Sequence, residues 1–147
     1  MKSRLHQLID APYERIFELA AGVERWPEIL PHYRYVRAVP DPNGERRFAM
    51  GARRGPIPVT WEAIQRPMRN ERRIEFVHTG GVTRGMEVAW RFEPRNGQVD
   101  VSIEHELDLR WPLIGELVAR TVIGPQFIEA IAGRTLRRVK ALAERGA

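Results

Sequence analysis

Two histidines occupy positions where an uninterrupted apolar row is otherwise expected. His78 follows Ile74 and Phe76 at alternate positions, and His105 interrupts the apolar row of Val99–Trp111. A neutral imidazole on a buried face needs a hydrogen-bond partner, which a side chain, a water molecule or a ligand can supply. The pattern favours satisfied core histidines at both positions and leaves contact with a ligand as the alternative.

Tryptophan is the second residue type that could serve a binding site. Three of the four tryptophans, Trp61, Trp90 and Trp111, fall on predicted apolar strand faces. A large aromatic ring most often fills a core, and this is the favoured role for any one of them. Several such rings on one concave face would also suit a flat polycyclic or quinone ligand, because aromatic walls combine apolar area with polar tips.

Several other chemistries lack the residues that they require. The chain has no cysteine, which excludes disulfides, thiolate metal ligands and thiol nucleophiles. The spacing of His78 and His105 gives no metal-ligand motif, so neither a metal nor another cofactor is predicted. We expect the glycine-containing segments 51–55 and 80–85 to be hairpin turns, because neither stands between a strand and a helix as a phosphate-binding loop does.

The charge pattern predicts a solvated surface of mixed sign. The net charge is +5, and all 24 basic residues except Lys2 and Lys140 are arginines. Acidic residues are interleaved with them, and no basic block carries the stacking aromatics that single-stranded nucleic acids favour. A nucleic-acid or ribosomal partner is therefore the less favoured alternative. We expect His6 and His32 at exposed ends of strands.

The sequence contains no stretch typical of a secretory signal or a membrane span. Met1–Leu8 holds Lys2, Arg4 and His6 without an apolar run, and no segment approaches the roughly 18 apolar residues of a span. The 147 residues are expected to form one domain, 1–147, that buries its own core. We therefore predict a soluble protein of the cytoplasm.

Apolar periodicity predicts seven strands. Along Val99–Trp111 apolar and polar residues alternate without a break, which indicates a long strand that is covered on one side only. Glycine, proline and asparagine bound the other strands, as turn residues do. The expected strands are Ser3–Ile9, Tyr33–Val39, Arg46–Ala52, Pro58–Gln65, Arg72–Thr79, Met86–Glu93 and Val99–Trp111.

Helical spacing predicts two short helices after the first strand and one long helix at the end. The long helix is expected over Leu113–Ala143, with a bend at Gly124-Pro125 because proline removes a backbone hydrogen bond. Consecutive strands joined by short turns form an antiparallel meander, and one long helix is its natural cover. The predicted fold class is α+β, with a seven-stranded antiparallel sheet curved around the C-terminal helix.

Segments near both ends of the chain resemble one superfamily. They are Asp10–Phe17, Trp26–Pro31, and Leu107–Leu109 followed by the terminal helix. In these segments the chain resembles the START-like (SRPBCC, helix-grip) superfamily, and within it the branch of polyketide cyclases/dehydrases and coenzyme Q-binding proteins. The resemblance implies a cavity between the sheet and the terminal helix that binds a hydrophobic molecule such as a lipid, a quinone or a polyketide.

The resemblance also implies candidate catalytic residues for an aromatase-like activity. In such relatives a tyrosine after the short helices and an arginine in the middle of the sheet orient a poly-β-ketone. An aldol cyclisation needs a donor that polarises a carbonyl and a group that handles an α-proton. For Arg66 a surface role is favoured, because its spacing from Trp61 differs from the family pattern by one residue. The candidates are Tyr33 and Tyr35, expected on one strand face, with Arg66, His78 and His105.

Three functions stay open from the sequence. The favoured one is binding of a hydrophobic small molecule without turnover, and the first alternative is a polyketide cyclase/dehydrase. The second alternative, implied by relatives that are ribosome-binding toxins, is an interaction protein. The sequence leaves the oligomeric state open. The residues expected to bind the ligand are Trp26, Tyr35, Trp61, Phe76, Trp90, His105, Phe127 and Ile131.

Overall fold

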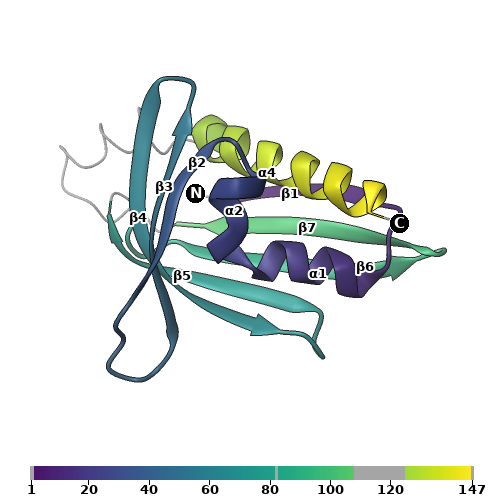
Figure 1. Cartoon of the computed structure of the whole chain (residues 1–147), viewed down its shortest axis with the longest axis horizontal. Helices are drawn as coiled ribbons and strands as arrows, with labels where there is room; N and C mark the ends of the chain where they lie inside the picture. The colour runs from purple at the N-terminus through teal and green to yellow at the C-terminus, as the bar shows by residue number, and fades with distance from the viewer. Residues whose placement is uncertain (1, 82, 108–124, 147) are drawn as a thin grey trace.

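The computed structural model describes residues 2–81, 83–107 and 125–146, with the backbone alone for 125–127. A curved sheet holds the C-terminal helix against one face, and short helices follow the first strand (Figure 1). The strands are β1 (Lys2–Ile9), β2 (Tyr33–Val39), β3 (Arg46–Arg54), β4 (Ile57–Met68), β5 (Arg73–Gly81), β6 (Glu87–Arg95) and β7 (Gln98–Glu106). The helices are α1 (Tyr13–Ala21), the 3-10 helix η1 (Val23–Arg25), α2 (Trp26–Ile29) and α4 (Pro125–Arg145).

The sheet is an antiparallel meander with the first strand added at the far edge. The strand order is β1-β7-β6-β5-β4-β3-β2, and every neighbouring pair is antiparallel. Asn96 and Gly97 between β6 and β7 have φ values of 52° and 82°, the left-handed conformation that a tight hairpin turn requires. The predicted helix-grip fold, with seven antiparallel strands around a C-terminal helix, is confirmed.

Alternation along the strands decides which face of the sheet is buried. In β7 the apolar row from Val99 to His105 is buried, and the intervening acidic side chains point to the outer face. Within the described residues this strand ends at Glu106, and Leu107 is still buried. The rest of the strand predicted to Trp111 lies outside the described residues.

Helix α4 covers the concave face with an apolar stripe. Its buried side chains recur at intervals of three and four residues, so they lie on one side of the helix. They are Ile128, Ala132, Leu136, Val139 and Ala143. Residues 113–124 of the predicted terminal helix lie outside the described residues, and so does the predicted bend at Gly124-Pro125.

The outer face of the sheet is a surface of paired charges. Glu104 lies 3.6 Å from Arg4 on β1 and 3.3 Å from Arg91 on β6, and Lys2 pairs with Glu106 at 3.8 Å. Exposed pairs of this kind add at most about 1 kcal/mol each to stability. They keep the outer face solvated, so the core and any pocket lie on the concave face.

A buried glutamine ties the short helices to the sheet. Gln65 on β4 is 2% exposed, and its Nε2 donates to the carbonyl of Ala21 at the end of α1 over 2.8 Å. Its Oε1 accepts a hydrogen bond from Arg46 Nε on β3, also at 2.8 Å. Both ends of the buried amide are therefore satisfied, and the position of α1 over the sheet is fixed.

Replacing this glutamine with an apolar side chain of similar size should destabilise the protein. In Gln65→Leu the Ala21 carbonyl and the Arg46 guanidinium lose a buried partner, which is expected to lower the free energy of unfolding by roughly 1–3 kcal/mol. Urea unfolding measures this change. Thr60→Ala, at an exposed position of the same strand, is the matched control. Equal unfolding midpoints for the two variants would contradict the role given to Gln65.

Candidate functional site

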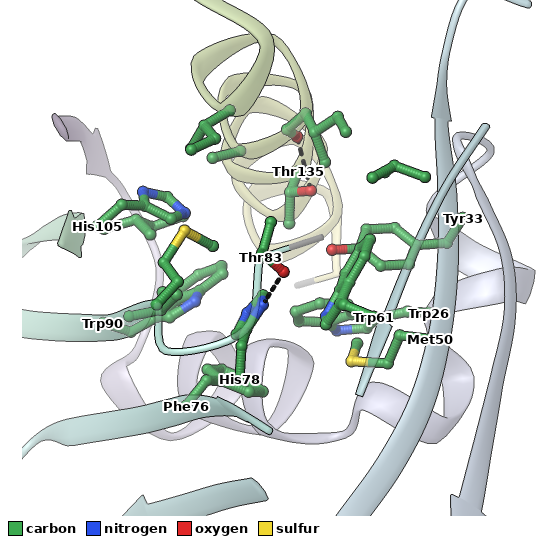
Figure 2. A pocket seen from close by; sticks show the side chains of 17 residues that line it. Trp26, Tyr33, Met50, Trp61, Phe76, His78, Thr83, Trp90, His105 and Thr135 are labelled. Atoms are coloured by element: carbon green, nitrogen blue, oxygen red, sulfur yellow. Dashed lines mark hydrogen bonds between the residues drawn. The ribbon is translucent and has the colours of Figure 1, made fainter. Parts of the chain in front are cut away.

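A pocket of about 90 Å³ lies between the concave face of the sheet and α4 (Figure 2). Its walls come from α2, from strands β2 to β7 and from the first turns of α4, so residues far apart in sequence meet there. The described residues that line it are Trp26, Tyr33, Met50, Val59, Trp61, Phe76, His78, Thr83, Met86, Val88, Trp90, Ile103, His105, Ile128, Ile131, Ala132 and Thr135.

The described wall of the pocket carries no arginine, lysine, aspartate or glutamate. Most of its side chains are apolar or aromatic, and the polar ones are hydroxyls and imidazoles. An ionised ligand buried here would meet no opposite charge from these residues, and burial of an unpaired charge is costly. The wall therefore suits an uncharged, largely apolar molecule.

Trp26 links the aromatic side chains into one wall. Its ring centroid lies 5.0 Å from that of Tyr33 and 6.2 Å from those of Phe76 and Trp90. Its Nε1 donates to the carbonyl of Leu19 over 3.0 Å, which fixes the direction of the indole. The mostly tilted or edge-on contacts are those that aromatic pairs prefer, so these rings support one another.

His78 is held between an aromatic ring and a hydroxyl. Its ring stacks on Trp61 with centroids 5.7 Å apart and an angle of 5° between the planes. Its Nδ1 shares a hydrogen bond of 2.6 Å with the hydroxyl of Thr83, which comes from the turn between β5 and β6 (Figure 2). Burial, together with the nearby His105, lowers the pKa of His78 to about 3. At neutral pH this imidazole is uncharged.

His105 is a buried imidazole with an unpaired nitrogen. It lies on β7 and is 8% exposed, and among the described residues its Nδ1 has no hydrogen-bond partner. Burial lowers its pKa to about 4, so it too is neutral at pH 7. Native proteins satisfy most buried polar atoms, so an unpaired one is unusual.

A second group of polar side chains lies where Tyr33 on β2 meets α4. Thr135 donates its hydroxyl to the carbonyl of Ile131 over 2.9 Å, and its Oγ1 lies 2.7 Å from Nε2 of His32. Because the threonine proton is used, the oxygen accepts from His32, which carries its proton on Nε2. Burial raises the pKa of Tyr33, and the contact with Thr135 opposes this rise in part.

The predicted exposure of His32 is wrong. Its side chain is 2% exposed, and burial lowers its pKa to about 4, with the positive charge of Arg134 acting in the same direction. His32 follows Pro31 just before β2, where the sequence predicted a strand end. It is buried because its hydrogen bond to Thr135 holds it between the chain segment before β2 and α4.

Tyr35 does not share a face with Tyr33, contrary to the prediction. Tyr33 pairs with Ala52, whereas Tyr35 pairs with Gly51, so one extra residue of β2 forms a bulge between them. A bulge reverses the alternation of side chains, and Tyr35 emerges on the outer face. There its ring packs over Gly51, where a Cβ would overlap it, and Arg37 covers it at 4.5 Å from the centroid.

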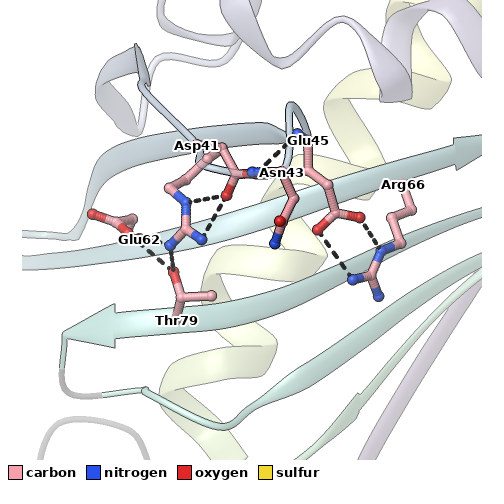
Figure 3. A network of polar contacts seen from close by, with 7 residues as sticks. Asp41, Asn43, Glu45, Glu62, Arg66 and Thr79 are labelled. Carbon is pink, nitrogen blue, oxygen red and sulfur yellow. Dashed lines mark hydrogen bonds and ion pairs between the residues drawn. The ribbon is translucent and has the colours of Figure 1, made fainter.

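Arg66 also lies away from the pocket, as the favoured surface role predicted. Its Nε donates to Glu45 Oε1 over 2.9 Å on the outer face of β4 (Figure 3). Arg66 is five positions from Trp61, so unbroken alternation places the two on opposite faces. No described candidate arginine reaches the pocket.

The structure brings most of the remaining predicted site residues to the pocket. Those at its wall are Trp26, Tyr33, Trp61, Phe76, His78, Trp90, His105 and Ile131, and their roles in binding stay predictions. The side chain of Phe127 lies outside the described part of the chain. Thr83 and Thr135 were not predicted as site residues. Thr83 stands in a turn, where side-chain direction has no simple period, whereas Thr135 could have been found from its place in the apolar stripe of α4.

Two further features concern metals and membranes. Within residues 2–81, 83–107 and 125–146, no three histidine, aspartate or glutamate side chains gather in a way that would hold a metal ion. No helix in the same part of the chain is both long and apolar enough to cross a membrane.

A curved antiparallel sheet around a C-terminal helix, with a pocket between them, defines the helix-grip fold. Residues 9–123 match the model of the family described as polyketide cyclase / dehydrase and lipid transport, and the chain belongs to this family. No curated relative matches the sequence.

Solved structures share this fold at low identity. The Zhui aromatase/cyclase of Streptomyces sp. R1128 has a TM-score of 0.79 at 19% identity, over 99% of this chain and 94% of that one. TTHA0849 of Thermus thermophilus has a TM-score of 0.74 at 22% identity, over 97% and 99%. A START superfamily protein of Mycobacterium smegmatis has a TM-score of 0.63 at 16% identity, over 96% and 98%. These identities show the fold alone.

The protein should lose stability as the pH falls from 6.5, the ordinary histidine pKa, towards the lowered pKa values of about 3 to 4. Above pH 6.5 the buried imidazoles are neutral in both the folded and unfolded states. Below it the unfolded chain takes up protons that the folded chain does not. The free energy of unfolding then falls by up to about 1.4 kcal/mol per pH unit for each histidine. Urea unfolding from pH 7.5 to pH 4.5 measures the slope.

A variant without one imidazole tests the assignment. His105→Phe should reduce the number of protons taken up on unfolding near pH 5 by about one, whereas Met86→Leu, an apolar change in the same wall, should keep it. If both variants show the slope of the unaltered chain, His105 is not the neutral buried group described here.

Proposed function

We propose that this chain binds a small hydrophobic molecule in the pocket between the sheet and α4. The observation that carries the proposal is a space of about 90 Å³ kept open inside a wall of aromatic and aliphatic side chains. A bound apolar molecule that fills this space removes its own surface and that of the aromatic and aliphatic wall from water, which favours binding.

The ligand class follows from the wall and from the family. Lipids, quinones and polyketide-like molecules are all largely apolar, and the family description includes both cyclases and lipid transport. Uncharged walls select against free carboxylates and phosphates in all three classes, because a buried ion would lack a partner. Binding of coenzyme Q and a cytoplasmic location remain predictions from the sequence.

A polyketide cyclase/dehydrase is the second candidate, and the two neutral imidazoles favour it. An aldol cyclisation needs a base for an α-proton, and His78 or His105 could accept one from a molecule in the pocket. Their lowered pKa values, about 3 and about 4, make both imidazoles weak bases at neutral pH. With Arg66 and Tyr35 on the outer face, binding without turnover is the better supported of the two functions.

The described surface does not favour the third alternative, a ribosome-binding protein. Arginines on the outer face are paired with acidic side chains, as in Arg66–Glu45 and Arg91–Glu104. A surface of alternating sign offers a phosphate backbone both attraction and repulsion. No observation on the described surface favours that partner over a small molecule.

Filling the pocket should abolish binding. Ala132 lies in the wall on α4, and in Ala132→Phe the new ring would occupy the open space. Mass spectrometry of an organic extract should find hydrophobic compounds with the unaltered protein and not with this variant. The matched control is Ala130→Phe, on the same helix but outside the wall. Equal amounts of the same compounds with both variants would show that they bind elsewhere.

A direct assay decides the second candidate. If the protein is a cyclase, it should change the ratio of cyclised products formed from a synthetic poly-β-ketone thioester. If His105 is the general base, His105→Phe should then lower the rate of enzyme-dependent cyclisation by roughly 10²-fold or more, the usual contribution of such a base. Ala130→Phe again serves as the control. A product ratio identical to that of the spontaneous reaction would rule out this activity towards the tested substrate.

A further inference from the structure

We propose that the end of the molecule at which the pocket opens docks on an anionic lipid bilayer. Arginines contact the phosphate groups there, and one exposed isoleucine enters the hydrocarbon layer. The residues that form this opening surface are Arg53, Ile57, Arg84 and Arg134. Transfer of a ligand from the bilayer to the pocket rests on the proposed function, whereas docking can be tested without it.

The pocket meets solvent between β4 and α4. Among the described side chains of its wall, Trp61 on β4 and Ile131 on α4 are partly exposed, and the others are buried. The turn between β5 and β6 lies beside Trp61, because Gly81 pairs with that residue in the sheet. This turn, the tip of the β3–β4 hairpin and the start of α4 lie at the same end of the molecule (Figure 1).

An apolar row leads from the hairpin tip to the pocket. Ile57, Val59 and Trp61 occupy alternate positions of β4 in an unbroken register with β3, so all three point to the concave face. Val59 and Trp61 line the pocket, whereas Ile57 is 47% exposed. Pro56 and Pro58 restrict the backbone on both sides of Ile57, so little conformational entropy is lost when this tip meets a surface.

The charges around this row are basic. The segments 51–61 and 80–85 contain no aspartate or glutamate. Arg53, Arg84 and Arg134 are exposed, and within the part of the chain that the structure describes none of the three forms an ion pair. Arginines of the outer face, such as Arg91, are paired with acidic side chains. An unpaired guanidinium binds phosphate well, because it presents several donors in one plane.

Arg53 and Arg134 come together at His32. The backbone N–H of Arg53 donates to the carbonyl of His32 over 2.9 Å. Burial and the charge of Arg134 both lower the pKa of His32, which places that arginine beside the same residue. Glu129, the acidic residue of the first turns of α4, accepts instead from the Ser3 hydroxyl over 3.2 Å. Ser3 belongs to β1, at the opposite edge of the sheet from β2.

The combination of features favours a bilayer as the partner. A nucleic acid would use the arginines but would leave Ile57 without an apolar partner. A bilayer presents anionic headgroups next to hydrocarbon, which matches both kinds of residue. It is also a phase in which hydrophobic ligands dissolve. The row of Ile57, Val59 and Trp61 would then connect the hydrocarbon with the pocket.

Sedimentation with vesicles measures the docking. The unaltered protein should bind vesicles that contain phosphatidylglycerol, should bind pure phosphatidylcholine much more weakly, and should lose affinity as salt is added. Arg53→Gln, Arg84→Gln and Arg134→Gln should each lower the partition coefficient about fivefold. Arg145→Gln removes the same charge at the exposed far end of α4 and should leave it nearly unaltered. Equal binding to both kinds of vesicle, or equal effects of all four variants, would overturn the proposal.

A serine at position 57 tests the apolar contact. Ile57→Ser should lower the partition coefficient roughly 3- to 12-fold, because only the exposed half of the side chain gains from entering hydrocarbon. Leu8→Ser is the matched control. Leu8 is 41% exposed and lies beside the second half of α4, where Lys140 donates to its carbonyl. If the two variants weaken binding equally, Ile57 does not enter the bilayer and the proposal is wrong.

Two soluble polyanions test the other partners. A single-stranded RNA oligonucleotide and polyglutamate carry negative charge without hydrocarbon. Either probe could bind the unaltered protein and lose affinity in Arg53→Gln and Arg134→Gln, while vesicles do not bind. The opening surface would then serve a nucleic acid or an acidic protein, and the proposal would be overturned.

Failure of docking can be told apart from failure of the proposed function. Extraction of hydrophobic compounds without vesicle binding would overturn the docking and leave the pocket function in place. Vesicle binding by both the unaltered protein and Ala132→Phe, with no compound extracted from either, would overturn the pocket function and leave the docking in place. If neither vesicles nor extracted compounds are found with the protein, both fail.

Discussion

Exclusion of water from the concave face of the sheet is the constraint on which the rest of this structure depends. It places His78 and His105 in surroundings of low polarity and keeps both imidazoles neutral. Burial also raises the free-energy cost of leaving a polar atom unpaired, so each hydrogen bond inside the pocket contributes to its geometry. The burial of both imidazoles and the hydrogen bond between His78 and Thr83 therefore shape this wall of the pocket. On the wet outer face the same features would mean little.

The sequence was sufficient for the fold because its strongest patterns are local. Alternation in Val99–Glu106 and the left-handed turn at Asn96-Gly97 each follow from side-chain volume and backbone geometry within a few residues. The bulge between Tyr33 and Tyr35 has no such signal. It depends on how β2 pairs with β3, and the packing of the Tyr35 ring over Gly51 forms only once both strands are in place. One inserted residue was enough to move a candidate site residue to the opposite face.

The candidate site was predictable where a local pattern, the alternation along a strand, sets the direction of a side chain. His78, His105 and Trp90 sit on regular strands, where alternation gives the direction of a side chain. Thr83 lies in a turn, and His32 lies before β2, so neither direction follows from a period. The partners of His78 and His32 are set by tertiary contacts: Thr83 folds back onto His78, and His32 reaches Thr135 on α4. Sequence patterns give the face of a residue, but these hydrogen bonds require the folded chain.

The two sides of the pocket differ in how far they can adapt. On one side Trp26 contacts Tyr33, Phe76 and Trp90, and its bond to Leu19 fixes the whole group. A movement of any one ring would disturb the others, so this side behaves as a rigid template. The opposite side consists of residues of α4, most of them aliphatic, among them Ile131 and Ala132. A change in ligand size during evolution of this fold is therefore easiest through the α4 residues. A change in ligand polarity is easiest through the few polar residues of the wall, its imidazoles and hydroxyls.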